Sequence, residues 1–264
     1  MLRVQRVVAA ILIAVAMNGV GAGGENARAE GAERGPEWFW SFQPFDPAQA
    51  DRAAKHAVAF SGTDLWRQGA FLYGGSLWAP AGLDHDGVVV KLFATRGYYR
   101  YRSGTLGDAT VTGAMYAASI MPGLRFSRGG VTVNMHAGLD YQVHVLAPDD
   151  PGSGTRGRHV GLRTAVDLWH QPTASTMVTA AATLTTIASA YAVRGAFGWR
   201  LLERFYLGPE AIVYGAANYR QLRIGVHVTG LNLLRLEWQA GVGYALDDDG
   251  HRGVYLRLSV SDKW

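Results

Sequence analysis

The feature that most constrains the fold is a strict two-residue alternation in "VTVNMHAGLDYQVHV", residues 131–145. Odd-numbered positions from Val131 to Val145 are apolar, whereas even-numbered positions from Thr132 to His144 are polar or glycine. Because successive side chains of a strand point to opposite faces, the pattern predicts one strand with an apolar face and a polar face. At about 3.3 Å per residue this strand extends over roughly 50 Å, although ordinary strands have only about 5–6 residues.

A similar alternation recurs from about residue 56 to the end of the chain. It is clear at 159–169, 190–201, 219–229, 234–246 and 252–264, and weaker at 57–66, 69–78, 87–102, 109–121, 175–187 and 204–215. The expected strands are then about seventeen residues apart, which exceeds the roughly 8–12-residue spacing of a β-sandwich. We therefore predict an all-β fold, a closed antiparallel transmembrane β-barrel of about 12 strands, with a secreted β-sandwich as the alternative.

The N-terminal residues are typical of an export signal. Arg3 and Arg6 precede an apolar run, Val7–Met17, that is too short to span a bilayer. We predict a cleaved signal peptide at residues 1–29, with cleavage after Ala29 or, at a rival site, after Ala22. Residues 30–55 lack periodicity and contain the aromatic run 38–40 (Trp38, Phe39 and Trp40), which predicts an irregular periplasmic segment before a barrel at 56–264.

Composition excludes two classes of protein. The chain has no cysteine, so no disulfide framework holds it together. Its formal net charge is +4, and three arginines against one glutamate in residues 1–29 account for half of that excess. The exported protein is then too weakly basic to indicate nucleic acid as a partner.

The last segment, "RGVYLRLSVSDKW", carries a second export feature. Gly253, the spaced Leu256 and Leu258 and the terminal Trp264 resemble the signal that the outer-membrane assembly machinery reads. We therefore expect the cell outer membrane as the location, with its lipid and that machinery as partners. An even number of strands places both termini in the periplasm and the longest expected loop, residues 146–158, outside the cell.

Motifs for catalysis or cofactors are weak. "GSGTRG" at 152–157 matches the dinucleotide fingerprint, but a strand follows it where the fingerprint needs a helix. The acidic runs at 84–87 and 247–250 lack the calcium-loop spacing and fit ordinary turns. His136 and Asp140 share a strand face about 13 Å apart. We therefore predict no metal, no cofactor and no catalytic residue. The alternative is an outer-membrane enzyme acting on lipid or glycan, which requires a serine, a histidine and an acid to converge at one rim.

The polar strand faces predict the lining of the lumen. The lumen-facing candidates are Lys91, Tyr99, Tyr101, His136, Asp140, Gln142, Arg163, Asp167, Arg194, Arg200, Gln221, Arg223, His227, Arg235, Glu237, Gln239 and Arg257. Arginines outnumber acids among them, so we expect a polar interior with a positive bias. Twelve strands leave a narrow bore. Two outcomes stay open, namely a pore that passes a glucan and a lumen plugged by its own arginine–carboxylate network.

The segment "YGGSLWAPAGLDHDGVVVKLFATRGYYRYRS" (73–103), together with "GVYLRLSVSDKW" at the end of the chain, resembles the cellulose biosynthesis protein BcsS family of bacterial outer-membrane proteins. The resemblance covers about residues 56–264. It implies a non-enzymatic barrel in a cellulose biosynthesis and secretion system, which aids export or surface handling of the glucan. Cellulose and other secretion components are the partners it implies, and it supplies no catalytic motif.

Overall fold

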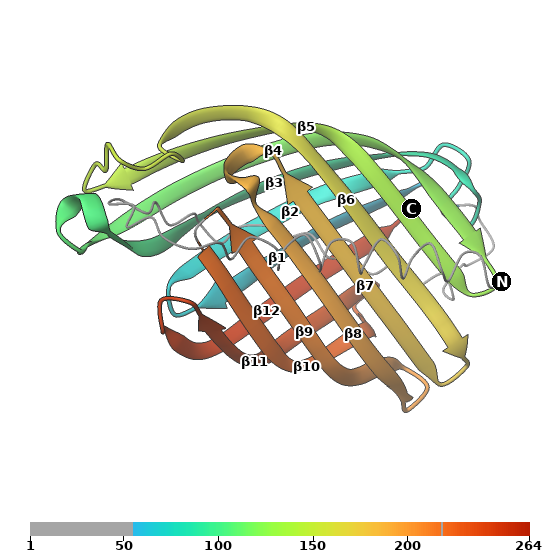
Figure 1. Ribbon diagram of the computed structural model, residues 1–264. Coiled ribbons are helices and arrows are strands. Elements are labelled where there is room, and N and C mark those ends of the chain that lie inside the picture. The colour runs from blue at the N-terminus through green and yellow to red at the C-terminus, as the bar shows by residue number, and fades with distance from the viewer. Residues whose placement is uncertain (1–54, 218) are drawn as a thin grey trace, which may run out of the picture. The chain divides into compact units, whose positions relative to one another are not determined.

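The computed structural model describes residues 55–264 except Asn218, and within them the chain forms a closed antiparallel barrel of twelve strands (Figure 1). The strands are β1 (Ala57–Trp66), β2 (Gly69–Trp78), β3 (Gly87–Ser103), β4 (Ala109–Arg128), β5 (Val131–Ala147), β6 (Gly157–Thr173), β7 (Thr176–Thr185), β8 (Tyr191–Leu201), β9 (Phe205–Ala216), β10 (Tyr219–Leu233), β11 (Leu236–Asp247) and β12 (Arg252–Lys263). The predicted fold class is confirmed. The predicted signal peptide and almost all of the irregular segment, including Trp38, Phe39 and Trp40, lie outside the described residues.

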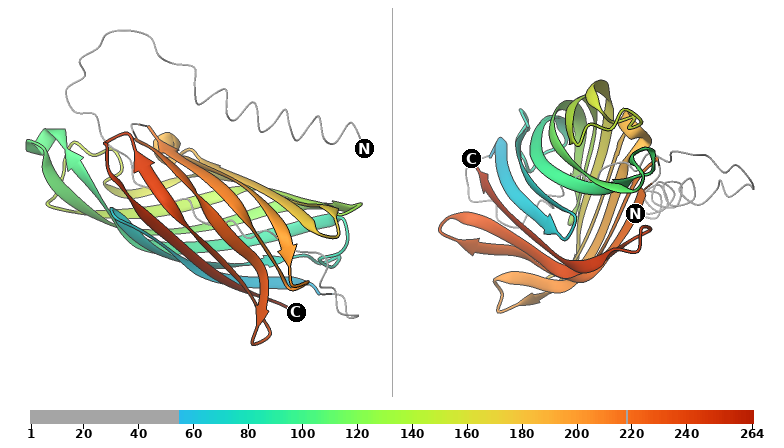
Figure 2. Two further views of the ribbon diagram at one scale, coloured as in Figure 1. Left: turned by 90° about the horizontal axis from the view of Figure 1, so that it is seen from below. Right: turned by 90° about the vertical axis from the view of Figure 1, so that its left-hand side faces the viewer.

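The barrel closes between its first and last strands, which lie side by side in Figure 2. Val58 pairs with Lys263, and the pairing continues to Leu65 and Leu256. The backbone of Trp264 extends the seam, because its N–H donates to the carbonyl of Ala57 at 3.0 Å. Every strand therefore has two neighbours, and no strand edge is left for the membrane to solvate.

Strand length divides the barrel into two parts. β3 to β6 contain 17 to 20 residues each, whereas β1, β2 and β7 contain 10. We call the end at which β1 starts and β12 ends the terminal rim, and the opposite end the distal rim. The long strands extend beyond the β1–β2 turn at the distal rim, where they carry the short helix η2 (Gly104–Leu106) and the β5–β6 loop, residues 148–156 (Figure 1). The second short helix, η3 (Ile187–Ser189), follows β7 at the same rim. The expected strand at 109–121 continues to Arg128.

The outer face of the barrel is apolar. On β5, the side chains of Leu139 and Val145 are each 58% exposed, and leucines, valines and isoleucines of the other strands share this face. Exposed aromatic residues flank it, for example Tyr116 and Phe126 on β4. Ten residues of strand separate these two rings, which gives about 34 Å along the strand and about 24 Å along the axis at a tilt of about 45°. This height matches the apolar band of about 25 Å in outer-membrane barrels.

Hydropathy adds one observation on helices. Among the described residues, no helix is long and apolar enough to cross a membrane.

The inner face is filled by side chains of two kinds. Phe71, Tyr73, Phe93 and Met115 belong to one buried apolar cluster, and the polar side chains of β5 from Thr132 to His144 are buried as the alternation predicts. Glycine makes this packing possible, because a Cβ on Gly97 would overlap the ring of Phe71. The interior is therefore a packed core that contains charges.

Candidate functional site

The first group of buried charges surrounds one carboxylate of β5, and we call it the Asp140 cluster. Asp140 is fully buried and accepts hydrogen bonds from Ser119 Oγ at 2.8 Å, Gln142 Nε2 at 2.7 Å and Thr185 Oγ1 at 2.8 Å. Among the described residues its one cationic partner is Arg163, whose Nη2 lies 3.0 Å from Asp140 Oδ1. Neighbouring strands β4 to β7 supply all five residues, so the cluster braces one side of the wall.

A second group contains more charged residues, and Glu210 of β9 accepts hydrogen bonds from three of its side chains. Arg194 Nε of the adjacent strand β8 donates to Glu210 Oε2 at 2.9 Å. Arg257 Nη2 of β12 donates to the same oxygen at 2.6 Å, and Tyr255 Oη donates to Oε1 at 3.0 Å. Gly241 leaves the space that the carboxylate occupies, because a Cβ on this residue would overlap Glu210 Oε1. Two arginines thus share one buried carboxylate.

Arg223 of β10 completes this second group. Its Nη1 donates to Asp64 Oδ1 of β1 at 2.9 Å, and its Nε donates to Gln221 Oε1 at 2.6 Å. The guanidinium also lies over the rings of Tyr214 and Tyr255, at 4.9 and 5.2 Å from the ring centres. We call Asp64, Arg194, Glu210, Arg223, Tyr255 and Arg257 the Glu210–Asp64 cluster. Two of its ion pairs, Asp64–Arg223 and Glu210–Arg257, join strands three places apart in the barrel.

Further inward ion pairs lie toward the terminal rim. Lys91 Nζ donates to Asp167 Oδ2 at 3.0 Å, and His136 Nδ1 lies 4.0 Å from the same oxygen. Lys263 Nζ donates to Glu237 Oε2 at 2.7 Å. Ion pairs therefore lie along the length of the interior, at contacts that sequence parity alone does not reveal.

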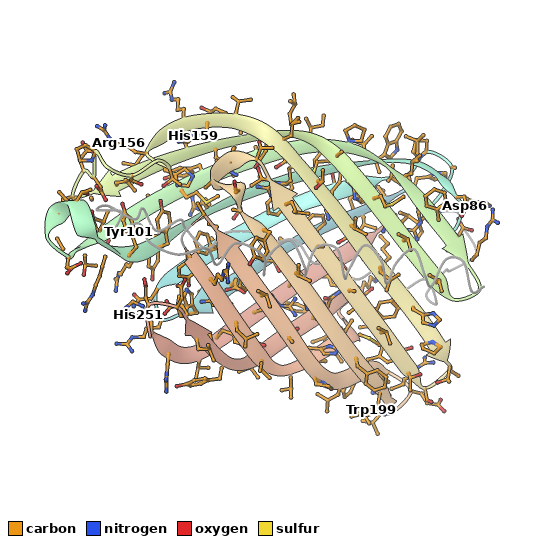
Figure 3. The ribbon with its side chains drawn as sticks, in the orientation of Figure 1. Asp86, Tyr101, Arg156, His159, Trp199 and His251 are labelled. Carbon is orange, nitrogen blue, oxygen red and sulfur yellow. The ribbon has the colours of Figure 1, made fainter. Side chains whose placement is uncertain are left out.

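A fourth carboxylate, Asp150 in the β5–β6 loop, fastens the loops of the distal rim. Tyr101 Oη donates to Asp150 Oδ2 at 2.9 Å, and Thr105 Oγ1 of the β3–β4 connection donates to Oδ1 at 2.7 Å. Figure 3 shows Tyr101 at this end together with Arg156 and His159, far from Asp86 and Trp199. Beneath the loop, the hydroxyl of Tyr99 and Nδ1 of His144 are 3.0 Å apart. We call the Asp150 contacts the distal latch.

Burial and hydrogen bonding act in opposite directions on this loop carboxylate. Burial raises the pKa of Asp150, but hydrogen bonds from Ser103, Thr105, Tyr101 and the Gly152 N–H outweigh burial and hold the pKa below its ordinary value of 3.8. The carboxylate is therefore charged at neutral pH, where the latch is formed.

Exposure decides whether the lumen is open. Arg163, Arg194, Arg223 and Arg257 are each no more than 2% exposed. A continuous water-filled bore past these side chains would expose them. These four side chains therefore do not line a water-filled bore.

Most predicted lumen residues point inward, as the alternation indicates. They are Lys91, Tyr99, Tyr101, His136, Asp140, Gln142, Arg163, Asp167, Arg194, Gln221, Arg223, His227, Glu237, Gln239 and Arg257. Two predictions are wrong. Arg200 is exposed at the end of β8, where its Nη2 donates to the carbonyl of Glu203, and Arg235 is exposed in the β10–β11 turn with φ 66°. In both cases the alternation was extended to the place where the strand ends.

Sequence reasoning missed the two acids that organise the second cluster. Asp64 and Glu210 lie on strands whose inward neighbours are mostly apolar, such as Phe60 and Trp66 or Ile212 and Tyr214. A polar face was therefore not visible at either strand. The available signal was the single acid within each strand, because a charge facing lipid is costly and an isolated carboxylate points inward.

The surroundings of the described histidines bear on the metal and enzyme alternatives. Asp247, Asp249 and His251 bring ligand atoms within 4.8 Å of one another at the distal rim, but His251 Nδ1 is already 3.1 Å from Asp247 Oδ2. The hydrogen-bond partners that we identify for the described histidines are a tyrosine, a threonine, carboxylates and backbone carbonyls. None of these identified partners is a serine.

Comparison with known proteins places the chain in a family. A model described as "Cellulose biosynthesis protein BcsS" matches residues 58–263, almost the whole barrel. The chain belongs to the cellulose biosynthesis protein BcsS family. The resemblance inferred from the glycine-rich hairpin and the last strand is thereby confirmed, and this BcsS-family barrel is associated with cellulose biosynthesis.

Solved structures similar to the BcsS-family barrel are distant. A KdgM porin is 10% identical, with a TM-score of 0.43, over 78% of this chain and 99% of the porin. The translocator domain of the autotransporter NalP from Neisseria meningitidis is 13% identical, with a TM-score of 0.45, over 83% of this chain and 91% of that domain. No curated protein matches the chain.

Proposed function

We propose that this BcsS-family protein is a closed, non-enzymatic outer-membrane barrel that serves a cellulose secretion system at the cell surface. The observation that carries the proposal is the Glu210–Asp64 cluster, in which three buried arginines and two buried carboxylates pair with one another inside the barrel and leave one positive charge in excess. The plugged accessory barrel is thus favoured over the glucan-conducting pore. In this proposal the barrel aids cellulose export at the membrane surface and does not pass the glucan through its lumen.

The chemistry of a glucan explains why the cluster opposes passage. A neutral sugar chain needs hydrogen-bond partners for its hydroxyl groups, and the guanidinium of Arg223 already donates to Asp64 and Gln221. Removing one partner from a buried ion pair typically costs about 3–5 kcal/mol. A single hydrogen bond to a sugar hydroxyl contributes only about 1 kcal/mol. A passing glucan therefore does not repay the separation of these pairs.

The proposal includes an orientation in the membrane. Both ends of the described barrel lie at the terminal rim, and the long strands and the latched loops lie at the other. Outer-membrane barrels have short turns on the periplasmic side and longer loops outside. The terminal rim then faces the periplasm, after export through the predicted signal peptide, and the distal rim presents the β3–β6 extension to the emerging cellulose.

Planar-bilayer recordings of the purified protein test whether the barrel is closed. We expect no steady conductance from the natural protein, and channels from the double variant Asp64→Ala/Arg223→Ala, which removes one ion pair together without leaving a lone charge. Asp86→Asn, at an exposed pair outside the lumen, is the matched control and should stay closed. Natural protein that conducts and is blocked by cello-oligosaccharides would overturn the closed barrel in favour of a conduit.

Deletion of the gene tests the place of action. We expect normal cellulose synthase activity in isolated membranes and reduced cellulose at the cell surface, measured by cellulose staining. Complementation by the natural, non-conducting protein should restore surface cellulose. Loss of synthase activity, or surface cellulose unchanged by the deletion, would contradict the proposal.

The proposed assembly signal has its own test. Trp264 lies at the closing seam, where its carbonyl accepts from the N–H of His56 at 2.8 Å and of Ala57 at 2.9 Å. Deletion of Trp264 should lower the heat-modifiable, folded fraction in the outer membrane severalfold. Trp264→Phe keeps an aromatic terminus and should assemble normally. Equal insertion of the deletion variant would show that Gly253, Leu256 and Leu258 suffice or that the signal lies elsewhere.

A further inference from the structure

Four arginines point away from the barrel near the distal rim. Arg96, Arg100 and Arg102 alternate along the outer face of β3, and Arg158 lies on the outer face of β6. All four are exposed, and in the described part of the chain none makes a side-chain ion pair or hydrogen bond. The adjoining loops contain three acids. Asp149 Oδ1 lies 2.6 Å from Arg156 Nε, and Asp150 is held in the distal latch, which leaves the exposed Asp108 against four arginines. The outer surface here is therefore positively charged.

Strand register brings two of these arginines into one row. Arg96 pairs with Tyr116 of β4, Tyr116 pairs with Val143 of β5, and Val143 pairs with Arg158 of β6. Three strand spacings of about 4.8 Å separate the two arginine backbones by roughly 14 Å. Both side chains are long enough to reach toward one ligand between them.

A groove runs beside this row on the outer surface of β1 to β4. Its walls include the apolar side chains of Leu65 and Leu72, the rings of Tyr98 and Tyr116, and the side chain of Arg96. The same two tyrosines are exposed on the membrane-facing surface, at the level where the apolar band ends. Aromatic residues concentrate at this level in outer-membrane barrels. The groove thus combines an apolar floor, which suits a hydrocarbon chain, with a cation at the membrane interface.

Charge determines which ligand suits the row. A guanidinium facing the membrane without a carboxylate needs an anion beside it, and its forked donors match phosphate oxygens. We propose that Arg96 and Arg158 bind the phosphate groups of a phosphorylated lipid of the outer leaflet, with one of its acyl chains in the groove. The site is separate from the lumen, and its place in the outer leaflet rests on the orientation proposed above.

Native mass spectrometry of the full-length protein released from detergent measures this binding. The probe is bisphosphorylated lipid A, compared with the same lipid after dephosphorylation and with a zwitterionic phospholipid. We expect the double variant Arg96→Gln/Arg158→Gln to retain at least tenfold less bisphosphorylated lipid, a change that corresponds to about 1.4 kcal/mol. Arg128→Gln, an exposed arginine that pairs with Asp86 at the terminal rim, is the matched control and should retain the natural amount.

Three outcomes would overturn the proposal. Equal retention of the phosphorylated and dephosphorylated lipids would show that the groove holds acyl chains only. Displacement of the lipid by millimolar inorganic phosphate would indicate a site for free anions. Unchanged retention by the double variant, with heat-modifiable mobility showing that it is folded, would place the lipid elsewhere on the barrel.

Discussion

The Asp140 cluster and the Glu210–Asp64 cluster both stabilise buried carboxylates, but with different kinds of partner. Asp140 is satisfied by one arginine and three neutral donors from its own or nearby strands, so its neighbours are held by short-range contacts. Glu210 has two arginines, and one of them comes from a strand three places away. The first cluster braces neighbouring strands of the wall, whereas the second joins strands that are three places apart. The second cluster therefore links more distant parts of the barrel through more buried charge.

The largest difference should appear when each carboxylate is neutralised. Glu210→Gln leaves Arg194 and Arg257 close together with no buried anion between them, which should lower the free energy of unfolding by about 3–5 kcal/mol. Asp140→Asn leaves only one buried arginine without its anion and keeps an oxygen for the neutral donors, so the loss is expected at the low end of this range, about 3 kcal/mol. Urea unfolding from detergent micelles measures both. Equal losses would contradict the distinction between the clusters.

A smaller effect tests the space around Glu210 without changing any charge. Gly241→Ala adds a Cβ that overlaps Glu210 Oε1, and overpacking of this kind typically costs about 1–3 kcal/mol. Gly195→Ala is the matched control, because a Cβ there meets nothing within 4 Å. The control should change the free energy of unfolding by less than about 0.5 kcal/mol. Equal free energies of unfolding for the two variants would show that the Glu210 side chain moves aside at little cost.

The distal latch extends the comparison to Asp150, a carboxylate whose donors in the described part of the chain are all neutral. The pKa of Asp150 is lowered in the folded protein, so the latch contributes its full stability above the ordinary pKa of 3.8 and loses it as pH falls through the lowered value. A spin label introduced by Gly154→Cys, in a chain with no other cysteine, should become mobile only in acid. Adding Asp150→Asn should make the label mobile at neutral pH as well. A label that is equally immobile in both proteins would show that other contacts hold the loop.

The smallest effect is expected at an exposed pair. Asp86 and Arg128 form an ion pair at the terminal rim, and Asp86 also accepts from the backbone N–H of Ser127. That backbone hydrogen bond, the largest cause, and the arginine lower the pKa of Asp86. Because water screens the pair, Asp86→Asn should leave the urea midpoint unchanged within error. A clear shift would mean that exposed pairs of this barrel contribute as the buried ones do.

Much of the fold follows from the sequence because lipid and lumen impose opposite demands on alternate residues. The pattern of residues 131–145 predicted the inward and outward faces of β5 correctly, and parity placed Arg194, Arg223 and Arg257 in the lumen. Parity fails at strand ends, as Arg200 and Arg235 show, because a turn releases the side chain from the pleat.

Pairing between charges was beyond sequence reasoning for a geometric reason. Asp64 and Arg223 are 159 residues apart, and their contact depends on the registers of the strands between them and on barrel closure. Alternation predicts which face of a strand a side chain lies on, but it does not predict how the strands are aligned with one another. Sequence reasoning therefore left the plugged lumen and the glucan pore as alternatives.

The seam between β1 and β12 has a consequence for how the protein is made. Val58 pairs with Lys263 across nearly the whole length of the described chain, so the contact that completes the cylinder has a very large sequence separation. Contacts of this kind form late and slowly. Until β12 is in place, the sheet has two open edges, at β1 and at β11. In the closed barrel, the ion pair between Asp64 on β1 and Arg223 on β10 reaches past β11 and β12, the two last strands. Because the two ends meet, a circularly permuted chain that joins residue 264 to residue 56 and opens at the distal 248–251 loop should still be able to close.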